Sequence, residues 1–116
     1  MTVREFYEKT GGDYDGTLKR LMNDTLVVRF LNRFLETSSL SGLEQAVRKK
    51  DYRAVFTEAH TLKGVAGNLG LTGLFDASST LCETCRNADP DYDLSPYLEK
   101  VEAAFREISE GIRSIG

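Results

Sequence analysis

The chain has 116 residues, of which 41% are hydrophobic and 28% are charged, and its formal net charge is −3. This length and balance are typical of a globular domain, so we expect residues 1–116 to form a single domain. The negative charge argues against a nucleic-acid partner, which requires a basic face. No apolar run approaches the roughly 18 residues that span a bilayer, and the first residues lack a secretory signal. We therefore expect a cytoplasmic protein with no membrane partner.

Helix signals begin close to the N-terminus. Apolar residues at helical spacing predict two short helices before Asp24, separated by Gly11 and Gly12. Asp24 is expected to cap a longer helix. The apolar stripe of that helix contains Val27, Phe30, Leu31, Phe34 and Leu35.

Two further helix starts follow in the middle of the chain. Ser41 and Glu44 have the spacing of a capping box, which predicts a short helix that continues to about Lys49. Asp51 is expected to cap the next helix, and Gly70 is a natural C-terminal stop for it.

The last two helices are predicted to begin at Thr72 and at the Ser95-Pro96 pair. The final helix keeps its apolar spacing to the end of the chain, at Leu98, Val101, Phe105, Ile108, Ile112 and Ile115. No segment alternates with the period of a strand. We expect an all-α fold, in which the four longest helices form an antiparallel four-helix bundle with short additional N-terminal helices.

The two cysteines, Cys82 and Cys85, have C-x-x-C spacing. A thioredoxin-like redox site would need a βαβ context, and a zinc site would need two more ligands. Neither is present, so we expect buried or half-buried thiols of a reduced protein and no metal site.

His60 is the only histidine, and it lies on the helix predicted between Asp51 and Gly70. A neutral imidazole is a competent nucleophile near pH 7. At about 100° per residue, the apolar side of this helix lies nearly opposite His60. The residues on the histidine side are Phe56, Lys63, Gly64 and Gly67, with Asn68 slightly further round.

Gly64 and Gly67 each cost about 1 kcal/mol against alanine inside a helix. Close packing of a neighbouring helix would explain glycines on the core side, but the angular positions place these two on the other side. We therefore favour access for the backbone of a partner and its reacting group. Lys63, three residues after His60, places an ammonium beside the imidazole.

The short connection around Leu71 predicts a helical hairpin. Residues equidistant from this turn lie at the same height in an antiparallel pair, which places Cys82 level with His60 and Arg86 level with Phe56. Arg86 is thus a candidate second cation for an anionic adduct, although an exposed arginine is also explained by solvation alone.

This stretch resembles the motif of the histidine-containing phosphotransfer (HPt) domain of bacterial and fungal phosphorelays. The matching positions are His60, Leu62, Lys63, Gly64, Ala66, Leu69 and Gly70. The resemblance implies that His60 carries a phosphoryl group, that Lys63 helps to hold its oxygens and that Gly64 leaves room for a receiver domain. Many members have a glutamine or glutamate where Cys82 stands, and a thiol is a weaker hydrogen-bond partner.

The resemblance also implies the partners. These are receiver domains of response regulators, which supply the aspartyl phosphate and Mg²⁺, together with a hybrid histidine kinase. The chain would then be a monomeric carrier without a cofactor of its own, and not an enzyme. We expect the receiver to dock over a set of residues from two helices: Phe56, Gly64, Gly67, Asn68, Cys82 and Arg86.

Other interpretations remain open at this point. The phosphoacceptor domain of a chemotaxis-type histidine kinase shares the motif but receives phosphate from a kinase domain. A non-catalytic helical adaptor is also compatible with the helix pattern. A general-base enzyme lacks an accompanying serine or cysteine nucleophile and an obvious pocket. A metal or haem bundle needs several inward ligands, and the chain has one histidine.

Overall fold

Helices form the regular structure of the protein. The computed structural model describes residues 1–87, 89 and 91–116. The helices are α1 (Val3–Thr10), α2 (Tyr14–Leu21), α3 (Asp24–Thr37), α4 (Ser41–Arg48), α5 (Tyr52–Asn68), α6 (Thr72–Asn87) and α7 (Ser95–Arg113). The predicted all-α class is confirmed, and the described residues contain no strand. None of the helices in this part of the chain combines the length and the apolar character needed to cross a membrane.

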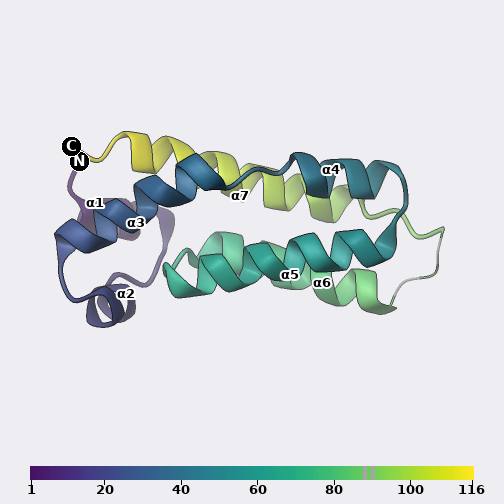
Figure 1. Ribbon diagram of the computed structural model, residues 1–116, viewed down its shortest axis with the longest axis horizontal. Helices are drawn as coiled ribbons and strands as arrows, with labels where there is room; N and C mark the ends of the chain where they lie inside the picture. The colour runs from purple at the N-terminus through teal and green to yellow at the C-terminus, as the bar shows by residue number, and fades with distance from the viewer. Residues whose placement is uncertain (88, 90) are drawn as a thin grey trace.

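The bundle has four antiparallel columns (Figure 1). Helices α5 and α6 form a hairpin, α7 runs back beside it, and α3 followed by α4 makes the fourth column. The predicted four-helix bundle is confirmed, with α1 and α2 as the additional N-terminal helices at one end. The observed bundle differs from the prediction in one respect: the fourth column consists of α3 and α4, not of α3 alone. The chain is extended at Ser38, and beyond this break α4 packs against α5.

The helix that carries His60 begins as predicted. The side chain of Asp51 accepts a hydrogen bond from the N–H of Ala54 and caps α5. The start of α3 is one residue earlier than predicted, because Asn23 is the cap and its side chain accepts from the N–H of Leu26. Asp24 is already helical.

The predicted capping box at Ser41 and Glu44 is wrong. Ser41 is the first residue within α4, Leu40 stands at the N-cap, and the described residues provide no side-chain cap there. The N–H of Ser41 donates to the hydroxyl of Ser39 at 3.2 Å. A cap must have a non-helical backbone for its side chain to reach back to the first turn, and Ser41 does not meet this condition.

The apolar stripe of α3 is also narrower than predicted. Val27, Leu31 and Phe34 are buried, but Phe30 is 44% exposed. Phe30 lies roughly 65° from the centre of the stripe at 100° per residue. Only the central positions of the stripe face the core, so Phe30 lies at the margin of the stripe.

The C-terminal end of α5 is held by the first two helices. The last carbonyls of a helix have no partners within it. The Tyr7 hydroxyl of α1 donates to the Leu69 carbonyl at 2.6 Å, and the N–H of Asp13 donates to the Gly70 carbonyl at 2.9 Å. Tyr7 is fully buried, and this burial raises the pKa of its hydroxyl to about 12.

Arg20 of α2 completes this junction. Its guanidinium donates to the Asn68 carbonyl at 3.3 Å and to the Gly67 carbonyl at 3.2 Å. A cation at the C-terminus of a helix also interacts favourably with the helix dipole. The three donors Tyr7, Asp13 and Arg20 therefore fix the end of α5, about two turns beyond His60.

Gly70→Ala tests this junction. Gly70 has φ +65, and a Cβ at this position would lie 2.1 Å from the Thr17 hydroxyl and 2.6 Å from the Asp13 carbonyl oxygen. We expect the variant to lose at least about 2 kcal/mol of unfolding free energy in urea denaturation, from backbone strain and displacement of the Asp13 segment.

Gly11→Ala is the matched control. Gly11 has φ +70, but a Cβ there would meet no atom of the described residues within 4 Å. It therefore reports the cost of the left-handed backbone alone, about 1 kcal/mol. Equal losses in the two variants would show that contact with the N-terminal segment contributes nothing at Gly70.

Candidate functional site

His60 stands on the solvent side of α5. Its side chain is exposed, whereas Val55, Ala59 and Ala66 on the opposite side have no exposed surface. The predicted orientation of the helix is thus confirmed. The cap at Asp51 and the junction at the other end of α5 fix this orientation, so that the imidazole faces outward from the middle of the helix.

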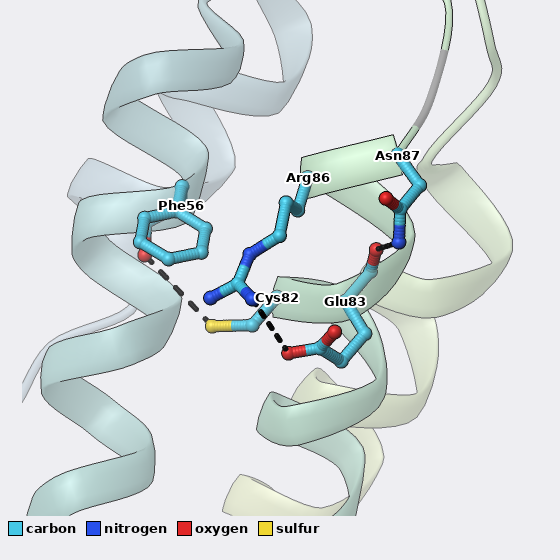
Figure 2. Close-up of polar contacts among 5 residues, drawn as sticks. All are labelled: Phe56, Cys82, Glu83, Arg86 and Asn87. Carbon is cyan, nitrogen blue, oxygen red and sulfur yellow. Dashed lines mark hydrogen bonds and ion pairs between the residues drawn. The ribbon is translucent and has the colours of Figure 1, made fainter.

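The ring of Phe56 lies against the imidazole from the preceding turn. The two ring centres are 5.7 Å apart and the ring planes differ by 7°, which is a parallel, offset stack. The Arg86 guanidinium of α6 lies 5.2 Å from the centre of the same Phe56 ring. Arg86 therefore meets Phe56, as the hairpin register predicts (Figure 2).

Cys82 lies beneath this cluster. Its side chain is 2% exposed, and its thiol points to the Phe56 carbonyl with an Sγ to oxygen distance of 3.9 Å (Figure 2). Burial raises the pKa of the Cys82 thiol, and the nearby charges of Lys63 and Arg86 oppose that shift. The structure corrects the expected docking set here, because a buried thiol offers almost no surface to a partner.

Both cysteines are buried free thiols, as predicted. Cys85 lies within hydrogen-bond distance of the Tyr52 carbonyl, with its Sγ 3.1 Å from that oxygen, and burial raises the pKa of its thiol. Each thiol thus sits against a backbone carbonyl of α5. The pair contributes to the packing of the hairpin that carries His60.

Lys63 reaches across to α6. Its ammonium lies 5.7 Å from the centre of the Phe75 ring, in a cation–π contact. Phe75 was not predicted as a site residue, because in the sequence it resembles any apolar residue on an amphipathic helix. The register about Leu71 places Phe75 level with Gly67, one turn beyond Lys63, and this was the available signal.

The two glycines of α5 have different surroundings. A Cβ on Gly64 would meet no atom of the described residues within 4 Å, so this glycine leaves an open face next to His60. A Cβ on Gly67 would lie 3.3 Å from two carbons of the Phe75 ring. Gly67 is half-exposed with the Phe75 ring beside it, so close packing of α6 accounts for this glycine as well, and access for a partner there remains a prediction.

The structure thus brings Phe56, His60 and Gly64 together on one exposed side of α5, with Arg86 beside them. Asn68 is exposed two turns further along, near the junction with α2. The described residues contain no group of three or more histidine, cysteine, aspartate or glutamate side chains arranged to hold a metal ion. The absence of a cofactor remains a prediction.

A comparison with known protein families identifies the family to which this chain belongs. The family model described as Hpt domain matches residues 29–111. The chain belongs to the Hpt domain family. Searches of curated proteins and of solved structures found no match. As an Hpt domain, the chain is a phosphotransfer domain of two-component signalling, and domains of this family interact with receiver domains.

The matched region covers the hairpin and all but the last two residues of α7, and it begins after α1 and α2. All the residues around His60 therefore lie within the part of the chain that defines the Hpt domain. The two helices before it supply the donors at the C-terminal end of α5.

Gly64→Gln tests the open face of the Hpt domain. Glutamine is a better helix former than glycine, so the variant should fold at least as well as the wild type. Its side chain would fill the space beside His60, and we expect phosphoryl transfer from a phosphorylated receiver to fall by about tenfold or more. Single-turnover transfer with a labelled receiver measures this.

Gly73→Gln is the control. Gly73 is another helical glycine whose Cβ would meet no atom of the described residues within 4 Å, and it lies near the turn of the hairpin, away from His60. This variant should transfer at the wild-type rate. A normal rate in Gly64→Gln as well would contradict the role of the open face.

Proposed function

We propose that this Hpt domain is a phosphoryl carrier in a phosphorelay, which moves a phosphoryl group between His60 and the aspartate of receiver domains. The observation that carries this proposal is the position of His60. It is the only histidine, it is exposed opposite the buried side of α5, and it stands next to the open Gly64.

The transfer is an in-line displacement at phosphorus. An unprotonated ring nitrogen of His60 attacks the aspartyl phosphate of the receiver, a P–N bond forms, and the P–O bond to the aspartate breaks. The aspartate leaves as a carboxylate, and the other ring nitrogen keeps its proton. The reverse attack by an aspartate returns the phosphoryl group, so the same site serves both directions.

The protein's contribution to such a transfer is positioning and charge stabilisation. The receiver brings the aspartate and its Mg²⁺, so this chain supplies the nucleophile and cations. Arg86 contacts the Phe56 ring that stacks on His60, and Lys63 lies three residues after His60 on α5, so the two cations flank the turn that carries the histidine. We propose that they stabilise the phosphoryl group on His60, whose oxygens carry close to two negative charges.

The proposal also covers the location, the oligomeric state and the partners of the protein. We propose a cytoplasmic monomer that acts as a carrier and not as an enzyme, with receiver domains of response regulators and a hybrid histidine kinase as its partners. Phe56, Gly64 and Asn68 are the exposed or half-exposed residues of α5 over which a receiver would dock, with Arg86 from α6.

His60→Gln tests the carrier function. The wild type should take up an acid-labile phosphate from a phosphorylated receiver, and the variant should take up none, because no other histidine is present. Circular dichroism and the melting temperature should remain nearly unchanged, since the side chain is exposed. A variant that unfolds would indicate a structural histidine, and phosphate uptake by the variant would place the acceptor elsewhere.

Lys63→Ala tests the contribution of the neighbouring charge. We expect transfer to slow by about fivefold at most at low ionic strength, because exposed charge pairs contribute about 1 kcal/mol or less. The effect should diminish as salt is added, because salt screens such charges. Lys63→Arg keeps the charge and should remain near the wild-type rate, and a charge-independent loss in both variants would instead indicate a geometric role.

A further inference from the structure

We infer that Phe56 is a positioning residue for the phosphoryl transfer, because its ring holds the His60 imidazole in the plane from which it attacks. This inference rests on the proposed carrier function and deepens it. It assigns to Phe56 a role in the chemical step, in addition to the proposed contact with the docked receiver.

The stack restricts a side chain that otherwise has little to hold it. An exposed histidine on a helix samples several rotamers, and its ring turns over a broad range about the last torsion. Phe56 lies one turn before His60, with the ring centres 5.7 Å apart and the planes within 7° of parallel. This contact favours one orientation of the imidazole plane.

The Phe56 ring is itself held from the neighbouring helix. The Arg86 guanidinium lies 5.2 Å from the ring centre, and an oxygen of Glu83 lies 3.8 Å from a guanidinium nitrogen of Arg86. The Cys82 thiol lies 3.9 Å from the Phe56 carbonyl oxygen. Figure 2 shows the phenyl ring of α5 beside these groups of α6. Ring and backbone of Phe56 are therefore both in contact with α6.

Stacking can orient an imidazole while leaving its nucleophilic nitrogen free, whereas a hydrogen bond occupies a nitrogen. The lone pair that attacks phosphorus lies in the imidazole plane, at the edge of the ring. A stacked phenyl ring covers a face and leaves both nitrogens free, whereas a hydrogen-bond partner occupies one of them. Because transfer depends on alignment, a displacement of about 1 Å can cost about a hundredfold in rate.

The inference separates two consequences of changing Phe56. A positioning residue alters the rate of transfer when the receiver is saturating. A docking residue alters the receiver concentration needed for half-saturation. Phe56→Leu removes the ring but keeps an apolar side chain. Phe56→Tyr keeps an aromatic ring that can stack on the imidazole in the same orientation.

The first measurement does not involve phosphate. His60 is the only histidine, so its imidazole protons give one set of signals in a proton NMR spectrum. The ring current of Phe56 shifts these signals in the wild type and in Phe56→Tyr. In Phe56→Leu they should move toward the values of an unstacked histidine. Identical shifts in the wild type and Phe56→Leu would overturn the inference, whatever the transfer rates.

The second measurement is single-turnover transfer from a phosphorylated receiver over a range of receiver concentrations. We expect the saturating rate of Phe56→Leu to fall by about threefold to tenfold, whether or not the half-saturating concentration also changes, and that of Phe56→Tyr to stay within about twofold of the wild type. If Phe56→Leu does not fold, Phe56→Met, which is also apolar and ringless, takes its place.

Three outcomes overturn the inference while the wild type accepts phosphate. These are an unchanged saturating rate in Phe56→Leu, a change confined to the half-saturating concentration, and a loss in Phe56→Tyr as large as in Phe56→Leu. A wild type that accepts no phosphate from any receiver instead overturns the carrier function itself, and the inference falls with it. The two failures are therefore distinguishable.

Discussion

The site depends on how the C-terminal end of α5 is closed. Four consecutive carbonyls there, from Gly67 to Gly70, receive hydrogen bonds from α1, α2 and the segment between them. The bond from Tyr7 to the Leu69 carbonyl is buried, and loss of this donor would leave that carbonyl without a partner, at a cost of about 1 to 3 kcal/mol. The junction holds this end of α5 in place, while the apolar side of the helix faces the core and His60 faces solvent.

The hairpin then gives the exposed histidine its neighbours. The reversal at Leu71 brings Arg86 against Phe56 and Phe75 against Lys63, so each side chain of α5 that flanks the imidazole is in contact with a residue of α6. The face around His60 is consequently more ordered than its exposure suggests. Gly64 and the Phe56 ring lie on either side of the same imidazole. Gly64 leaves space beside it, and the Phe56 ring restricts its orientation.

Periodicity in the sequence was sufficient to predict the helices, the bundle and the outward direction of His60, because all three follow from which residues recur on one face. The contacts of single side chains were harder to predict. Gly64 and Gly67 look alike in the sequence, yet the Phe75 ring of α6 lies against Gly67 and leaves Gly64 open. Likewise, the position of Ser41 within the helix, one residue past the N-cap, depends on backbone torsion angles that a capping pattern does not determine.

The chemistry of the α5 junction has a consequence for experiments that vary acidity. Its donors are a guanidinium, a backbone amide and the Tyr7 hydroxyl, and its acceptors are backbone carbonyls. A guanidinium stays protonated, and amides do not titrate in the usual range. Burial raises the pKa of Tyr7 to about 12, so its hydroxyl keeps its proton, and the stability it provides, until the solution is strongly alkaline. This junction therefore stays closed from acidic to moderately alkaline solution, and it holds the helix that carries His60 over that whole range.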